Sequence, residues 1–150
     1  MTNLPQQGQH LPEVHFTTES GERLGAGDLA GGKTVLYFYP RDDTPGCTKE
    51  ACAFRDRMDD YAAAGIEVYG VSLDSPESHR RFREKYNLNF PLLTDEGGRA
   101  AHALGVLREG GKKANRVTFL LAPGGSIAKV YPEVSPETHA DEILDDAASL

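Results

Sequence analysis

The sequence predicts an α/β fold in a single domain, and three observations lead to this prediction. Segments with the hydrophobic pattern of strands alternate along the chain with segments that have the pattern of helices. The tripeptide Ser-Pro-Glu, which starts helices, begins at Ser75 and again at Ser135. The chain has 150 residues, 39% of them hydrophobic, which suffices for one packed core. We therefore expect one domain over residues 1–150, with about the first 12 residues loosely held.

The first strand, turn and helix are expected within residues 34–64. Residues 34–39 are almost all apolar or β-branched, which is typical of a strand buried on both faces. Residues 40–46 contain two prolines and a glycine and therefore predict a turn. A helix is expected to follow and to end near Ala64.

The second half of the chain predicts two more helices and a hairpin. A buried strand is expected at residues 66–73, directly before the first Ser-Pro-Glu. In each tripeptide the serine can act as N-cap, with proline at the first helical position and an acid in the first turn. These signals predict helices at residues 76–86 and 136–147. Residues 116–121 and 126–131 flank the sequence Ala-Pro-Gly-Gly and predict a β-hairpin.

The chain has only two cysteines, Cys47 and Cys52, and both lie at the start of the helix predicted after the first buried strand. In the first turn of a helix the backbone N–H groups are unpaired and the helix dipole is positive. Both effects favour a thiolate over a thiol. Cys47 is therefore a candidate nucleophile.

The spacing of the two cysteines predicts that their oxidation is coupled to a change of conformation. Five residues of ideal helix rise about 7.5 Å and turn about 140°, which places the two Cα atoms roughly 8 to 9 Å apart. A disulfide needs less than about 7 Å. Cys47 and Cys52 could therefore join only after the first turn or two of the helix unwinds.

The two cysteines are also expected on different faces of this helix. Cys52 lies about 100° away from the stripe that contains Cys47 and stands nearer to solvent. Different surroundings suggest different roles, because in thiol peroxidases one thiolate becomes a sulfenic acid and a second thiol condenses with it. The stripe consists of Cys47, Ala51, Phe54, Met58 and Tyr61.

The residues around Cys47 form a motif of fixed spacing. Pro40 is followed after three residues by Thr44, and Thr44 after two residues by Cys47, within the sequence Thr-Pro-Gly-Cys-Thr. This pattern, together with Cys52, resembles the peroxiredoxins, and specifically their Q-type subfamily, the bacterioferritin comigratory proteins. The resemblance covers nearly the whole chain, since it continues at residues 53–58, 70–76, 89–95 and 116–121.

This resemblance implies a thioredoxin-like fold of the peroxiredoxin type, with a central mixed β-sheet flanked by helices. It implies that Cys47 is the peroxidatic cysteine and that Cys52 resolves the resulting sulfenic acid as an intramolecular disulfide. Thr44 would orient the peroxide through its hydroxyl, and Pro40 would shield the site.

Three more residues are expected to support the reaction. The resemblance implies that Arg116 completes the pocket, where a guanidinium favours the thiolate and can hold a peroxide oxygen. The backbone N–H of Gly46, like that of Cys47, is available as a donor at the helix start. Glu50 is well placed to orient an arginine.

The chain departs from the family pattern at three places. Residues 14–16 read Val-His-Phe where Pro-Asp-Phe is usual, and residues 105–107 lack an aromatic side chain that is often found there. The connection at residues 107–115 is shorter than in many relatives, so the preferred size of hydroperoxide stays open. The basic residues at 108–113 predict a solvated loop.

Composition excludes several classes of protein. The net charge of −7, with acidic residues spread along the chain, argues against nucleic acid as the main partner. No apolar run approaches the roughly 20 residues of a membrane span, and the N-terminus has no signal-peptide pattern. Two cysteines are too few for a secreted disulfide scaffold. We therefore expect a cytoplasmic protein that does not contact membranes.

The five histidines show no spacing typical of metal ligands and are expected at the surface. No metal, haem or flavin is expected as a cofactor. The histidines are His10, His15, His79, His102 and His139.

The function that the sequence predicts is a cysteine-dependent hydroperoxide reductase that is recycled by a dithiol protein such as thioredoxin. A general thiol–disulfide oxidoreductase is less well supported, because that chemistry usually employs Cys-x-x-Cys, which is missing here. A non-enzymatic redox sensor, switched by a disulfide between Cys47 and Cys52, stays an alternative that sustained turnover would separate from an enzyme. The resemblance to the subfamily favours a monomer.

Overall fold

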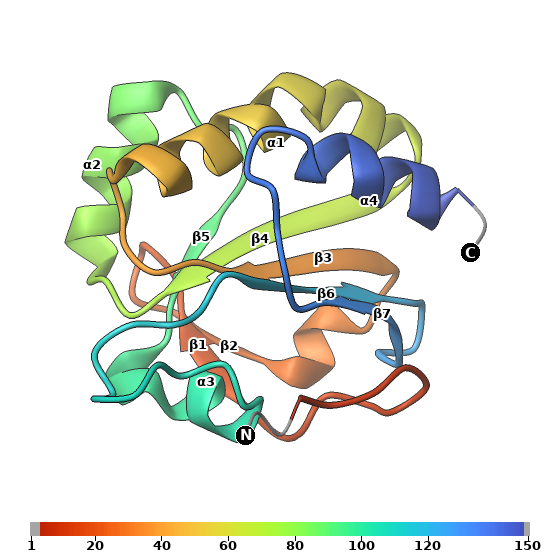
Figure 1. Ribbon diagram of the computed structural model, residues 1–150, viewed down its shortest axis with the longest axis horizontal. Helices are drawn as coiled ribbons and strands as arrows, with labels where there is room; N and C mark the ends of the chain where they lie inside the picture. The colour runs from red at the N-terminus through yellow and green to blue at the C-terminus, as the bar shows by residue number, and fades with distance from the viewer. Residues whose placement is uncertain (1–3, 149–150) are drawn as a thin grey trace.

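The computed structural model describes residues 4–148 and contains one mixed seven-stranded sheet (Figure 1). The order of the strands in the sheet is β2-β1-β5-β4-β3-β6-β7. Strand β3 is parallel to β4 and β4 to β5, whereas the other neighbouring pairs are antiparallel. The strands are β1 (His15–Thr17), β2 (Arg23–Gly25), β3 (Lys33–Phe38), β4 (Ile66–Ser72), β5 (Leu92–Thr94), β6 (Val117–Leu121) and β7 (Ile127–Tyr131).

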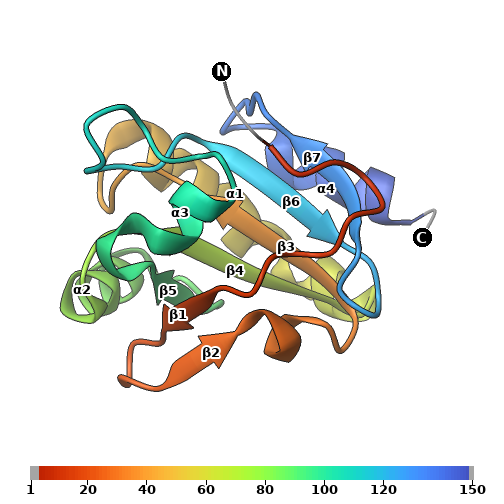
Figure 2. The same ribbon diagram turned by 90° about the horizontal axis from the view of Figure 1, so that it is seen from below.

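Helices cover both faces of the sheet (Figures 1 and 2). Helices α1 (Pro45–Ala63), α2 (Pro76–Tyr86) and α4 (His139–Ala147) lie on one face. Helix α3 (Arg99–Ala103) lies on the other face. The 3-10 turn η1 (Ala26–Leu29) connects β2 to β3, and η2 (Glu96–Gly98) connects β5 to α3. The prediction of a central mixed sheet flanked by helices is thus confirmed.

Strand β3 supplies side chains to both hydrophobic cores. Val35 and Tyr37 point into the core beneath α1, α2 and α4, whereas Leu36 and Phe38 point into the core on the α3 side. Such alternation is expected of a strand that is covered on both faces. Because β3 is paired with both β4 and β6 from Thr34 to its end at Phe38, the residues that follow it start from a rigid position.

Most predicted elements agree with the structure. Helix α2 has the predicted limits, and the Ser75 side chain caps it by accepting a hydrogen bond from the Ser78 backbone N–H at 3.1 Å. Strands β3, β4, β6 and β7 and the end of α1 agree to within about one residue. The predicted hairpin turn is closed by the bond from the Ala122 N–H to the Ser126 carbonyl.

The predicted start of the last helix is wrong. Helix α4 begins at His139, three residues later than residue 136. The Ser135 carbonyl accepts from the N–H groups of Thr138 and His139 and closes a single turn. Thr138 then has φ −115° and ψ −6°, outside the usual helical range, so the turn does not continue into α4.

The expectation that all five histidines lie at the surface is also wrong. His79 is fully buried and His139 is 1% exposed. Both imidazoles have polar partners on each ring nitrogen, which explains how a polar ring can occupy the core.

The segment before β1 runs beside the β6–β7 turn (Figure 2). The Gly8 N–H donates to the Ile127 carbonyl and the Ile127 N–H to the Gln9 carbonyl, both at 2.7 Å. Loose ordering of the first residues stays a prediction, and residues 1–3 lie outside the described part of the chain. No helix within residues 4–148 combines the length and the apolar composition that crossing a membrane requires.

Candidate active site

The candidate site lies where β3 passes into α1. Helix α1 begins at Pro45 after the N-cap Thr44, whose φ of −105° and ψ of 156° are those of extended backbone. Cys47 is therefore the third residue of the helix, at the end with unpaired N–H groups, as predicted. Its side chain is only 2% exposed, and one turn later Glu50 is fully buried.

Arg116 reaches this point from the neighbouring strand. It directly precedes β6, and the antiparallel register pairs Val117 with Phe38 at the end of β3. One guanidinium nitrogen, Nη2, lies 3.3 Å from Cys47 Sγ, while Nη1 donates to Glu50 Oε1 at 2.8 Å. The arginine thus bridges the sulfur and a buried carboxylate, and the predicted orienting contact between Glu50 and an arginine is present.

Burial and charge change the proton affinities around the sulfur. Burial raises the pKa of Glu50 to about 7, although Arg116 acts in the opposite direction. Burial lowers the pKa of Arg116, but the charges of Glu50 and Cys47 outweigh this effect and raise it above the ordinary value. Arg116 therefore stays a guanidinium beside the sulfur.

The shifted pKa of Glu50 predicts a pH dependence of stability that Glu50→Gln removes. Between about pH 4.5 and about pH 7 the folded protein binds more protons at Glu50 than the unfolded chain does. Its contribution to stability is therefore complete below about pH 4.5 and lost as the pH rises through about 7. A shift of this size corresponds to about 3 kcal/mol.

This prediction can be checked by urea unfolding of both proteins near pH 5 and near pH 8. The free energy of unfolding should fall more steeply with pH in the wild type than in Glu50→Gln. Equal slopes in the two proteins would contradict the assignment of this titration to Glu50.

Two polar atoms beside the site are buried and have no hydrogen-bond partner within residues 4–148. They are the Tyr37 hydroxyl and Glu50 Oε2. Burial, followed by the charges of Glu50 and Cys47, raises the pKa of Tyr37 well above its ordinary value. Tyr37 stacks on Phe54 at 4.8 Å between ring centroids, so it forms a rigid neutral wall behind α1.

The remaining residues of the motif shape the approach to Cys47. The Thr44 side chain makes no capping hydrogen bond to α1, and its hydroxyl donates to the Arg41 carbonyl at 2.9 Å. A Cβ atom on Gly46 would lie 3.0 Å from Arg116 Nη2, so glycine lets the guanidinium cross the helix start. Pro40 is partly buried at the beginning of the loop.

Cys52 lies apart from this group. It is partly buried, whereas Cys47 is buried, and both are free thiols. Cys52 lines a surface groove of about 600 Å³ between α1 and the start of α4, with Lys49, Glu137 and Asp141 among the lining residues. The expected difference in surroundings between the two cysteines is confirmed.

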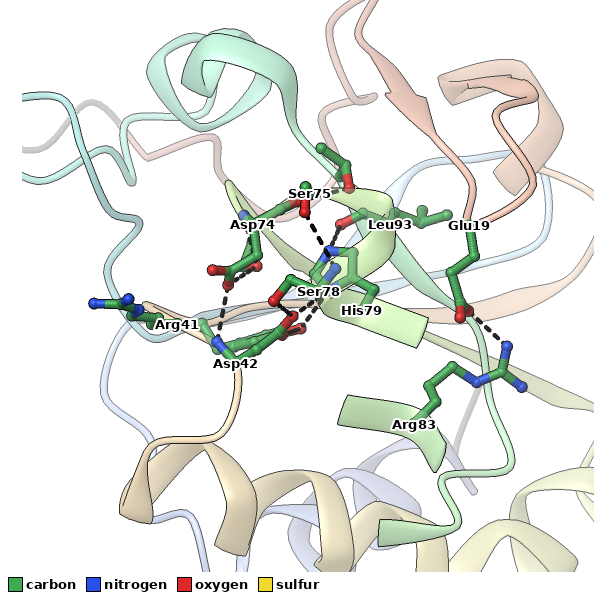
Figure 3. Close-up of polar contacts among 12 residues, drawn as sticks. Glu19, Arg41, Asp42, Asp74, Ser75, Ser78, His79, Arg83 and Leu93 are labelled. Carbon is green, nitrogen blue, oxygen red and sulfur yellow. Dashed lines mark hydrogen bonds and ion pairs between the residues drawn. The ribbon is translucent and has the colours of Figure 1, made fainter. Parts of the chain in front are cut away.

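Sequence reasoning missed a buried polar network next to the site. It joins Asp42 and His79 and is drawn in Figure 3. Two adjacent aspartates in the turn were the available signal, but a polar turn residue is usually exposed and His79 is expected at the surface from its sequence alone. Among residues 4–148, no three His, Cys, Asp or Glu side chains are grouped as metal ligands.

Comparison with known proteins finds one family of relatives that matches most of the chain. The AhpC/TSA family matches residues 7–130. The putative peroxiredoxin bcp of Coxiella burnetii is 44% identical over 143 residues, which cover 91% of this chain and 95% of the relative. The chloroplastic peroxiredoxin Q of Populus jackii is 41% identical and matches 92% of this chain but 66% of its own length.

A solved structure of the Xanthomonas campestris bacterioferritin comigratory protein has the same fold. It superposes with a TM-score of 0.85 at 30% identity and covers 99% of this chain and 98% of that one. The expected thioredoxin-like fold of the peroxiredoxin type is thus confirmed.

Proposed function

Because the chain belongs to the AhpC/TSA family, and within it to the Q-type or bacterioferritin comigratory peroxiredoxins, it is a thiol peroxidase, and we propose that Cys47 is its peroxidatic cysteine. The observation that carries this assignment is the contact of Arg116 Nη2 with Cys47 Sγ at 3.3 Å. Cys52 shares its surface groove with Lys49 and Arg57, but within residues 4–148 no hydrogen bond from either cation to its sulfur is described. The two cysteines therefore have different roles, in which Cys47 attacks the peroxide and Cys52 reacts afterwards with the sulfenic acid.

In the first step the Cys47 thiolate attacks one oxygen of the hydroperoxide. An S–O bond forms, the O–O bond breaks, and the departing oxygen takes a proton to leave as water or an alcohol. Sulfur is oxidised to sulfenic acid, and the peroxide is reduced by two electrons. Hydrogen peroxide and organic hydroperoxides are both proposed as substrates, since the related bacterioferritin comigratory protein of Xanthomonas campestris has alkyl peroxide reduction activity.

Arg116 stabilises the charges that this step moves. Its guanidinium favours the thiolate before attack and the oxygen that becomes negative as the O–O bond breaks. Glu50 fixes the guanidinium by the 2.8 Å bond to Nη1, which leaves Nη2 for the sulfur and the substrate. Glu50 is thus a positioning residue.

The loop and the helix start complete the substrate site. Thr44 donates to the Arg41 carbonyl, so its oxygen lone pairs are free to accept from the hydroperoxide O–H. Pro40 shields the site from water, and the N–H groups of Gly46 and Cys47 are donors at the helix start.

In the second step Cys52 condenses with the sulfenic acid. The Cys52 sulfur bonds to the Cys47 sulfur, and the sulfenic oxygen leaves as water. Because both cysteines belong to α1, the start of the helix must unwind before the sulfurs meet. The disulfide is proposed to be intramolecular, and the resemblance to the Q-type subfamily favours a protein that works as a monomer.

A dithiol protein, proposed to be thioredoxin, then returns the enzyme to its reduced form. It transfers two electrons to the disulfide and leaves with a disulfide of its own. Such a cycle needs a compartment that keeps cysteines reduced, so we place it in the cytoplasm.

Sustained turnover tests this function. Reduced protein with hydrogen peroxide, thioredoxin, thioredoxin reductase and NADPH should consume NADPH over many cycles. After peroxide alone, the intact mass under non-reducing conditions should be that of a monomer lighter by two hydrogens. Oxidation that occurs once and cannot be reversed by thioredoxin would instead indicate a redox sensor.

Cys52→Ser should separate the two steps. It should still reduce one equivalent of peroxide, because Cys47 and Arg116 are untouched, and then stop as a sulfenic acid that dimedone traps. The measurement is the mass of the dimedone adduct on Cys47 together with the loss of steady-state turnover. Unchanged thioredoxin-dependent turnover would reject Cys52 as the resolving residue.

A further inference from the structure

The loop between β3 and α1 lacks regular secondary structure, although it carries residues of the proposed site. It runs from Tyr39 to Thr44. Asp43 has a φ of +56°, in the left-handed region that non-glycine residues seldom adopt. A conformation of this kind persists only where surrounding contacts impose it.

Contacts from α2 impose this conformation on the loop. The Asp43 carboxylate accepts from Lys85 Nζ at 2.8 Å and from the Tyr86 hydroxyl at 2.7 Å, at the end of α2. Asp42 is held near the start of the same helix, where Ser78 Oγ donates to it at 2.8 Å. Two successive aspartates therefore fasten the loop along one helix.

Asp42 is the buried member of this pair and has the larger number of partners (Figure 3). Its carboxylate accepts from the Tyr39 hydroxyl at 2.5 Å and lies 2.7 Å from His79 Nδ1. Its backbone N–H donates to the Asp74 carboxylate at 2.8 Å, just after β4. Both the main chain and the side chain of residue 42 are thus fixed.

The hydrogen bonds of His79 explain how it holds a carboxylate. Its Nε2 lies 3.0 Å from the Leu93 carbonyl, which can only accept, so this nitrogen carries a hydrogen. Its Nδ1 lies 2.7 Å from the Asp42 carboxylate, so the ring bridges Asp42 and the Leu93 carbonyl. His79 is fully buried and ties Asp42 to the backbone of β5.

We propose that Asp42 and His79 are positioning residues for peroxide reduction, which hold the β3–α1 loop so that Thr44 and the start of α1 stay in register with Arg116. This inference rests on the proposed function of Cys47. Neither residue touches the sulfur in the contacts described. They act through the loop from Tyr39 to Thr44, which contains Pro40 and ends at the N-cap of the catalytic helix.

The expected effect is kinetic because the reacting atoms must be placed closely. A displacement of about 1 Å can cost roughly a hundredfold in rate. Thr44 is bonded only to the Arg41 carbonyl among the hydrogen bonds described for its side chain, so a shift of residues 41–42 moves its hydroxyl directly. Loss of the pair should therefore reduce the rate even in a folded protein.

Asp42→Asn tests the proposal with little change of shape. An amide has one acceptor oxygen where the carboxylate has two, and it carries no charge, so the bonds to Tyr39, Ser78 and His79 should weaken and the loop should loosen. The second-order rate of Cys47 oxidation by hydrogen peroxide, followed by stopped flow, should fall by roughly 10- to 100-fold. Amide hydrogen exchange over residues 41–48 should become faster in the reduced protein.

Glu19→Gln is the matched control, because it weakens α2 at a place that does not touch the loop. Glu19 accepts from Arg83 Nη1 at 2.6 Å and, like Asp42, anchors α2 through a carboxylate (Figure 3). This variant should lose stability but keep the wild-type rate with peroxide. A purely structural role of Asp42 would make the two variants behave alike.

Ser78→Ala is a milder second variant that decides the outcome if Asp42→Asn does not fold. It removes one hydrogen bond to Asp42 and should slow peroxide reduction in the same direction by a smaller factor. If these variants oxidise Cys47 at the wild-type rate and show wild-type amide hydrogen exchange over residues 41–48, the proposal is overturned, while Cys47 remains the nucleophile. If the wild type itself reacts slowly, the proposed function fails, and the exchange of residues 41–48 alone decides whether the pair holds the loop.

Discussion

Cys47→Ser is expected to abolish peroxide reduction completely. A serine hydroxyl stays protonated near neutral pH, and its oxygen cannot pass through the sulfenic acid on which the cycle depends. The substitution changes one atom of a side chain that is 2% exposed, so the fold should survive. The measurement is steady-state NADPH oxidation with the thioredoxin system, together with single-turnover peroxide consumption.

Cys52→Ser is the control for this experiment, because it removes the other thiol of the same helix. It should keep the first turnover, which Cys47→Ser loses. Peroxide consumption by Cys47→Ser above the background of a free thiol would show that another group reduces peroxide. The assignment of Cys47 would then be abandoned, whatever the family of the chain.

The parts of the fold that the sequence predicts well are those with strong local signals. Strand β3 is apolar from Val35 to Phe38, and Ser75 followed by proline is a cap that needs no tertiary support. The same tripeptide at Ser135 does not start a regular helix, because Thr138 leaves helical geometry and the buried His139 begins α4 instead. Local signals determine the type of each of these elements, whereas packing decides where α4 begins.

In the candidate site too, some residues can be predicted from local sequence and others depend on tertiary packing. The place of Cys47 at a helix start follows from a few neighbouring residues. Arg116 has no local signal of function, and its contact depends on the pairing of β6 with β3, so only resemblance to a family pointed to it. Asp42 and His79 are far apart in sequence and both polar, and their shared burial arises from the packing of α2 against the sheet.

Arg116→Met is expected to cause the second large loss, about 10²- to 10³-fold in the rate of peroxide reduction. This is the usual cost of removing one preorganised donor from a developing negative charge. The variant also leaves Glu50 buried without its 2.8 Å partner, so Glu50 should become neutral at higher pH than in the wild type. Stopped-flow oxidation and alkylation of Cys47 near pH 7 should both become slower.

Arg116→Lys distinguishes charge from geometry at the same position. An ammonium keeps the positive charge but lacks the planar fork that reaches Cys47 and Glu50 together, so an intermediate rate is expected. Arg108→Gln, on the exposed loop that precedes Arg116 in the chain, removes the same charge outside the site and should react as the wild type does. If Arg116→Lys equals the wild type, charge alone would suffice and the bridge to Glu50 would have no kinetic role. If Arg116→Met also reduces peroxide at the wild-type rate, the guanidinium contact to sulfur would not be what activates Cys47.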